Sequence, residues 1–160
     1  PPYPTTAQLV DALRAAAPDH LQTLITDYFD RIAFWELKFE GDIAVTPNTD
    51  GGYKVVLTAV VDKKIAAEED GKETSITEMD GEGLDEWIEI GFYDKNPKDT
   101  LGDEWLKLER IHITQLKTEL TFNLDERPTH ILLDPRRLLM ERNYDDNVKK
   151  LPKKLAGLGK

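Results

Sequence analysis

The sequence contains no cysteine, which excludes disulfides and thiolate metal sites. It has no apolar run of about eighteen residues, the length that a membrane-spanning helix needs. The motifs H-E-x-x-H, G-x-S-x-G, G-x-G-x-x-G and the P-loop are also absent, so the common signatures of zinc peptidases, hydrolases and nucleotide-binding proteins are missing. No signal peptide pattern opens the chain, and its start at Pro1 leads us to expect a piece of a longer protein.

Basic residues are scarce over most of the chain. Five of the 21 Lys and Arg residues lie in residues 149–160, which leaves 16 against all 31 acidic residues and a net charge of −15 before that segment. Such a body repels phosphates, which argues against a nucleic-acid partner. We expect residues 148–160 to form a solvated, flexible basic tail, the alternative being contact with an anionic membrane surface.

The hydrophobic fraction of 39%, with three Trp, five Phe and five Tyr, is enough for the core of one domain. Residues 1–31 are predicted to be a helical linker from a preceding domain. Thr5 or Thr6 caps a first helix that ends before Pro18, and a second helix begins there. Its apolar residues follow the i, i+3, i+4, i+7 rule and predict one broad stripe: Leu21, Leu24, Ile25, Tyr28, Phe29 and Ile32. Because this stripe needs a cover, Leu21, Ile25 and Phe29 form a candidate interface.

From Ile32 the period of the sequence changes to two, which is typical of strands. Residues 35–39 and 53–62 alternate on either side of a glycine turn at 48–52, so they are expected to pair antiparallel. Asp70-Gly71 indicates a two-residue hairpin, which would place Ile65 opposite Ile76. Further alternating segments at residues 87–94, 106–113, 116–124 and 128–133 complete about seven strands. The fold class predicted is mainly β, an immunoglobulin-like antiparallel β-sandwich over residues 32–147 preceded by two short α-helices.

The stretch P-T-H-I-L-L-D-P-R-R-L-L-M-E-R-N-Y-D-D-N, residues 128–147, opens as a strand that must end at Asp134-Pro135, because proline has no N–H for a ladder. The run that follows is expected to fold back on the sandwich through Leu138, Leu139 or Met140. Arg142 is then expected to pair with a carboxylate, and Asp145, Asp146 or Asn147 to satisfy backbone N–H groups. The alternative is that these four residues form a clamp for an anion or a substrate.

Four sets of residues are candidate catalytic, metal or ligand sites, and each also has a simpler structural explanation. The histidines have no partner histidine at ligand spacing. The acidic loop lacks the D-x-D-x-D-G pattern, which favours a solvated loop, with a calcium site as the alternative. The strand glutamates are typical of the solvent-exposed face of a sheet. The aromatic residues are explained by packing in a core at least as well as by a groove that binds a sugar or a peptide. In order, the sets are His20, His112 and His130; Asp80, Glu82, Asp85 and Glu86; Glu36, Glu40, Glu89 and Glu109; and Trp87, Trp105 and Tyr93.

A resemblance covers most of the chain from about Asp19 to Asn147. I-L-L-D-P-R-R-L-L-M-E-R-N-Y-D-D-N-V resembles the C-terminal signature of bacterial membrane proteins that fuse a transporter-type permease to an aminopeptidase N-like zinc peptidase region. The positions that match are Asp134, Pro135, Arg142, Asp145, Asp146 and Asn147. Arg136-Arg137 departs, since that family more often has an aromatic residue and an asparagine there. P-D-H-L-Q-T-L-I-T-D-Y-F-D-R-I is similar to the helix by which that family leaves its peptidase region, and D-E-W-I-E-I-G-F-Y-D resembles part of its sandwich core.

The resemblance implies a non-catalytic accessory domain that packs beside the peptidase region of its own chain, on the periplasmic, extracytoplasmic side of a bacterial membrane. It implies that zinc belongs to the parent's peptidase region, and none is expected in this fragment. The expected partners are the preceding peptidase-like domain and peptide substrates. The alternatives are a free-standing carbohydrate- or peptide-binding sandwich and an enzyme that uses carboxylates.

Overall fold

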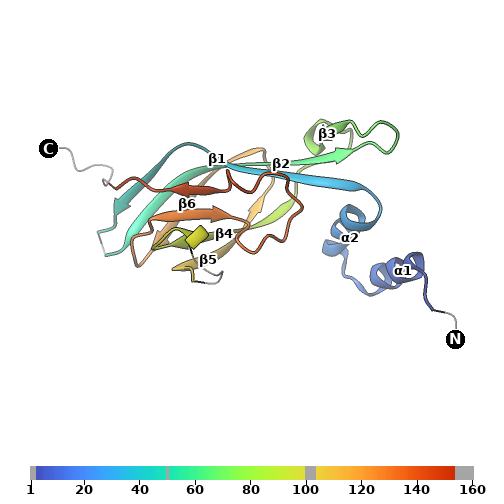
Figure 1. Ribbon diagram of the computed structural model, residues 1–160, viewed down its shortest axis with the longest axis horizontal. Coiled ribbons are helices and arrows are strands. Elements are labelled where there is room, and N and C mark those ends of the chain that lie inside the picture. The colour runs from blue at the N-terminus through green and yellow to red at the C-terminus, as the bar shows by residue number, and fades with distance from the viewer. Residues whose placement is uncertain (1–2, 50, 100–103, 154–160) are drawn as a thin grey trace.

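Two four-stranded antiparallel sheets follow two short helices along the chain (Figure 1). The computed structural model describes residues 3–49, 51–99 and 104–153. In order, the elements are α1 (Thr6–Ala16), η1 (Asp19–Leu21), α2 (Gln22–Phe29), β1 (Ile32–Pro47), β2 (Tyr53–Ala66), β3 (Glu73–Ser75), η2 (Ile76–Glu78), β4 (Glu86–Tyr93), η3 (Pro97–Asp99), β5 (Lys107–Ile113), β6 (Lys117–Leu124), β7 (His130–Leu133) and β8 (Val148–Lys150). The predicted mainly β, antiparallel architecture with two short helices is confirmed.

The first sheet is built on the long hairpin of β1 and β2. The two strands pair antiparallel around the turn at residues 48–52, as predicted, with one register shift between Glu40 and Ala44. The other edge of β2 pairs with β6 along its first half and with β3 near its end. The turn requires Gly52, which has a φ of +76°, because a Cβ there would lie 2.4 Å from the carbonyl oxygen of Leu124 on β6.

The second sheet has the strand order β5-β4-β7-β8. Ile131 and Leu133 of β7 are fully buried on one face, as predicted, and β7 ends immediately before Asp134. The prediction of a flexible tail from residue 148 is wrong at its start. Residues Val148–Lys150 pair with β7 as β8, and Leu151 is buried in the core. The remainder of that predicted tail, residues 154–160, lies outside the described residues.

Both sheets contribute side chains to a single hydrophobic core. The alternation in the sequence explains the contribution of β1 and β2, because every second residue of these strands points inward and most of these residues are apolar. The buried members from the first sheet are Ala33, Trp35, Leu37, Phe39, Ile43, Val45, Val55, Leu57, Ala59, Val61, Phe122 and Leu124. Those from the second sheet are Ile88, Ile90, Phe92, Ile111, Ile113, Ile131 and Leu133.

The hairpin after β2 differs from its predicted register. Ile65 lies opposite Thr74, because the connecting loop closes at its base with a hydrogen bond from Ala67 N to Lys72 O of 2.9 Å. Ile76, which was expected opposite Ile65, leaves the ladder and enters η2, where it is buried in the core. Burial of this isoleucine therefore outweighs the local preference of Asp70-Gly71 for a two-residue turn.

The helices form as predicted and extend from one end of the sheets (Figure 1). Thr5 caps α1 in a capping box with Gln8, and the helix ends before Pro18. None of the residues of α1 is buried. It is held against α2 instead, where Gln22 donates hydrogen bonds to the carbonyl oxygens of Arg14 and Ala17.

Candidate functional site

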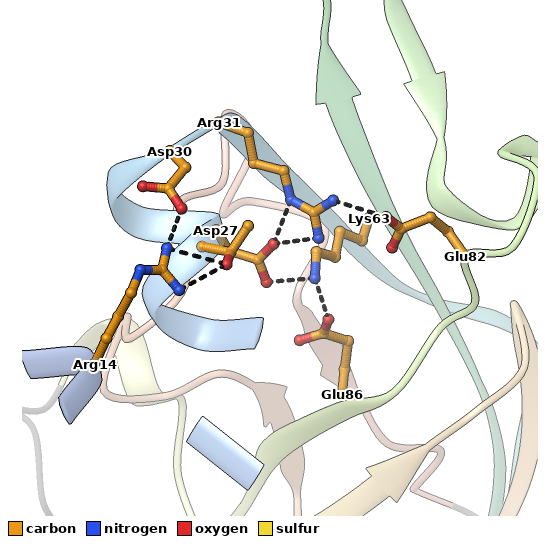
Figure 2. Close-up of polar contacts among 8 residues, drawn as sticks. Arg14, Asp27, Asp30, Arg31, Lys63, Glu82 and Glu86 are labelled. Atoms are coloured by element: carbon orange, nitrogen blue, oxygen red, sulfur yellow. Dashed lines mark hydrogen bonds and ion pairs between the residues drawn. The ribbon is translucent and has the colours of Figure 1, made fainter. Parts of the chain in front are cut away.

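A buried ion cluster joins α2 to both sheets and is the most unusual polar feature of the chain (Figure 2). Lys63 on β2 is 2% exposed, and its ammonium group contacts the carboxylate of Asp27 on α2. The same nitrogen donates to Glu86 Oε1 on β4 at 2.9 Å. Lysine, aspartate and glutamate are almost never this deeply buried unless they are paired.

The position of Lys63 follows from the period of β2. Val55, Leu57, Ala59 and Val61 point inward, and Lys63 is the next residue of the same parity. Its ammonium group also lies 5.5 Å from the centre of the Trp35 ring, which is within the range of a cation–π contact. The sequence therefore contained a signal for a buried lysine, although not for its two partners.

Arg31 adds a second cation to the cluster. Arg31 donates from Nε to Asp27 Oδ1 at 2.7 Å and also contacts Glu82, so Asp27 has two cations while Glu86 has Lys63 alone among the described residues. Burial by itself lowers the pKa of Arg31, but the hydrogen bonds and charges of Asp27 and Glu82 outweigh it, so its pKa lies above the ordinary value. Every member of this arrangement is satisfied by another, which makes it an anchor between elements.

The segment after β7, residues 134–147, covers the free edge of β1, and we call it the strap. Asp134 has a positive φ of 46° and is 2% exposed, and its carboxylate accepts hydrogen bonds from Leu138 N and Leu139 N, both at 2.9 Å. Burial raises the pKa of Asp134, although these two hydrogen bonds act against the shift. Asp134 thus ends β7, as predicted, and also organises the turn that starts the strap.

Glu141 attaches the strap to β1. Trp35 N donates to Met140 O at 2.9 Å, and Leu37 N donates to Glu141 Oε1 at 2.8 Å, so the side chain of Glu141 takes the place of a neighbouring strand. Its other oxygen accepts from Asn147 Nδ2 at 2.6 Å, while Asn147 Oδ1 is buried and has no hydrogen-bond partner among the described residues. Burial raises the pKa of Glu141. Sequence reasoning did not single out Glu141, because its acceptor role depends on a strand 104 residues away.

The predicted motif residues of the strap have separate contacts. Arg142 meets a carboxylate, as predicted, which is Glu73 of β3, and it lies 4.3 Å from the centre of the Phe34 ring. Asp145 is exposed and pairs with Lys98. Asn147 bonds to the side chain of Glu141 rather than to a backbone N–H. Of the apolar residues expected to fold back, Leu139 packs on the core while Leu138 and Met140 remain about half exposed.

Arg136 and Arg137, the two positions that differ from the pattern of the family that the sequence resembles, also make contacts. Arg136 donates to both carboxylate oxygens of Glu89, which is 8% exposed although it lies on the outward face of β4. Arg137 has a positive φ of 54° and its guanidinium lies 4.9 Å from the centre of the Tyr144 ring. The Arg136–Glu89 contact connects the strap to the second sheet, whereas the Arg137–Tyr144 contact lies within the strap.

The other candidates from the sequence lie apart from one another. His20 is exposed on η1, His112 contacts Asp85, and His130 hydrogen-bonds to Thr129. Within residues 3–49, 51–99 and 104–153, no group of three or more His, Cys, Asp or Glu residues has the geometry to hold a metal ion. The strand glutamates are dispersed, each contacting a different cation: Glu36 with Lys64, Glu40 with Lys117, Glu89 with Arg136 and Glu109 with Lys107.

The three aromatic candidates differ in their exposure to solvent, and so do the three residues of the candidate interface. Tyr93 is buried, Trp105 is partly buried and Trp87 is 53% exposed, so these three rings do not share one surface. On α2, Ile25 is covered by the chain itself, whereas Phe29 is 48% exposed; Leu21, at the end of η1, is partly buried. Interface formation by these residues stays a prediction, and for Ile25 the cover is already present.

No helix in the described part of the chain is both long and apolar enough to cross a membrane. No protein family, no curated protein and no solved structure matches the chain.

Proposed function

We propose that the chain is a non-catalytic accessory domain, an immunoglobulin-like β-sandwich, of an aminopeptidase-like, permease-fused membrane protein. In this proposal it packs beside the peptidase region of its own chain and shapes the access of substrates or partners on the extracytoplasmic side of a bacterial membrane. Any zinc would belong to that peptidase region. The proposal rests on the resemblance at residues 19–147 and on one structural observation, the uncovered apolar surface of the two helices.

This helical surface consists of exposed apolar residues on α1 and α2: Leu9 (52% exposed), Leu13 (39%), Leu24 (43%) and Phe29 (48%). A helix in water is stabilised mainly by burying its apolar face, and α1 buries none of its residues against the rest of the described chain. Exposed apolar side chains gathered on neighbouring elements are typical of a binding surface. The segment that resembles the exit from a peptidase region, residues 18–32, supplies Leu24 and Phe29 to this surface.

The buried ion cluster supports the same role because it determines how the helices are held. Asp27 of α2 contacts Lys63, and Lys63 contacts Glu86 of the second sheet, so α2 is tied to both sheets. Arg14 of α1 contacts Thr26 of α2 and Asp30, which caps the C-terminus of α2, and this extends the connection to the first helix. A neighbouring domain bound at the helical surface would thus be held in one orientation to the sandwich.

The test has a genetic and a biochemical part. The coding sequence upstream of Pro1 is expected to encode H-E-x-x-H on a helix followed by a further glutamate. If it does, the upstream region is produced separately and its association with the 160-residue chain is measured by calorimetry. The variant Leu9→Ser/Leu13→Ser/Leu24→Ser should bind more weakly, whereas Leu116→Ser, at a 38% exposed position outside the helices, should bind as the parent does. An upstream region without the motif, or equal binding by both variants, would contradict the proposal.

A further inference from the structure

An exposed tryptophan marks a second surface, on the outward face of the second sheet. Trp87 of β4 is 53% exposed and lies opposite His112 of β5 in the ladder. The two rings stack with their centres 4.7 Å apart and an angle of 15° between their planes. His112 also contacts Asp85, so the ring that stacks on the Trp87 indole has a second contact of its own.

Beside this tryptophan lies an arginine that has no ion pair with any residue the structure describes. Arg110 of β5 is directly opposite Glu89 in the ladder, but both oxygens of Glu89 are taken by Arg136 of the strap. Among the described residues Arg110 has no carboxylate within ion-pair distance, and its guanidinium lies 5.4 Å from the centre of the Trp87 ring. The strap therefore leaves an available cation on a chain whose net charge is −10.

A cavity of about 170 Å³ lies between the strap and the sheet at this point. Its lining includes Trp87, Arg110, Arg136 and Leu138 of the strap, which is 53% exposed. It also includes Glu89 and Asp134, whose carboxylates already accept hydrogen bonds, from Arg136 and from the backbone N–H groups of Leu138 and Leu139. The cavity therefore combines a flat aromatic wall, an aliphatic wall and a fork of N–H donors. A guanidinium matches a carboxylate with two parallel hydrogen bonds, whereas an indole face favours an apolar or aromatic group.

We infer that this pocket binds a carboxylate carried on an apolar residue, with Arg110 holding the carboxylate and Trp87 and Leu138 holding the side chain. A peptide ending in an apolar residue with a free terminal carboxylate has this chemistry, and an internal Glu or Asp next to an apolar residue is the other source. A polyanion is disfavoured by the acidic body of the chain. The site uses none of the residues of the helical surface and does not depend on the proposed function.

The experiment is a titration of the 160-residue chain with three short peptides, followed by calorimetry and tryptophan fluorescence. One peptide ends in Leu-Phe with a free carboxylate, the second is its C-terminal amide, and the third is an amide with an internal Glu. The free-carboxylate peptide should bind saturably and lose affinity with added salt, and the plain amide should bind at least about tenfold more weakly. Equal binding of the third peptide would keep the carboxylate site and assign it to acidic side chains.

Variants identify the residues. Arg110→Ala should weaken binding by about tenfold or more, and Arg110→Lys should recover only part of it because lysine lacks the two-point geometry. Trp87→Ala should weaken binding as well, while Lys117→Ala, at an exposed lysine on β6, should match the parent. Circular dichroism of each variant verifies folding, and Arg110 is exposed, so its replacement leaves the core intact. Absence of saturable binding, or parent-like binding by Arg110→Ala, would overturn the inference.

Discussion

The buried ion cluster yields a quantitative prediction for the variant Lys63→Met. Methionine keeps the length and apolar stem of the side chain but removes the cation that contacts Asp27 and Glu86. Removing one partner of a buried ion pair costs about 3–5 kcal/mol, because an uncompensated charge remains in the interior. Asp27 keeps Arg31, and the side chain of Glu86 is 11% exposed. The expected loss is therefore at the low end of that range, about 3 kcal/mol.

The neighbouring lysine is a matched control. Lys64 contacts Glu36 in a pair whose side chains are 27% and 57% exposed, so Lys64→Met should cost less than about 1 kcal/mol. A second control is the double variant Lys63→Met/Glu86→Leu, which removes the stranded carboxylate as well. It should return to within about 1 kcal/mol of the parent, since well-packed apolar groups often replace a buried ion pair without loss.

The assay is urea unfolding followed by tryptophan fluorescence, with the free energy of unfolding obtained by linear extrapolation. Trp35 is 1% exposed and lies near Lys63, so its emission reports on this part of the core. The reasoning is refuted if Lys63→Met costs no more than Lys64→Met. It is also refuted if the double variant is no more stable than the single one, since the loss would then come from packing and not from charge.

Three further predictions concern the strap and one concerns a turn. Glu141→Ala should cost about 2 kcal/mol or more by leaving buried donors unpaired. Glu141→Gln should cost less than about 1 kcal/mol, because its Oε1 can accept from Leu37 N and its Nε2 can donate to Asn147 Oδ1 once the Asn147 amide turns over; urea unfolding compares the two variants. Burial raises the pKa of Asp134 and of Glu141 in the folded chain. At a pH just above the ordinary pKa of these groups, the folded state therefore binds more protons than the unfolded state. Their contribution to the free energy of unfolding is therefore largest below about pH 4 and falls as the pH rises, and the variant Asp134→Asn/Glu141→Gln should lose this part of the pH dependence. Arg142→Ala should lower stability by about 1 kcal/mol or less, since its ion pair lies at the surface, and a larger loss would mean that the strap depends on it. Gly52→Ala should lower the melting temperature more than Gly51→Ala, because both have positive φ but only Gly52 faces a backbone oxygen; equal shifts would contradict the clash.

Local patterns were sufficient for the elements whose residues act on their immediate neighbours. The alternation from Tyr53 onward produces β2, because burying every second residue needs only a strand with one inward face. Thr5 begins α1 by bonding to a backbone N–H three residues away. Asp134-Pro135 ends β7, since proline cannot continue a ladder. Each of these outcomes is determined within a few residues.

Packing decided the features that join distant parts of the chain. Lys63 could be placed inside by parity, but Asp27 and Glu86 became its partners only because α2 and β4 meet at the end of β2. Ile76 is buried in the core and does not pair in the predicted hairpin register. Val148–Lys150 forms a strand because it pairs with an edge of β7 that no other strand of the described residues occupies. Glu141 completes the edge of β1 from 104 residues away. These contacts depend on which surfaces the folded sheets present to each other, and a pattern of nearest neighbours does not contain that information.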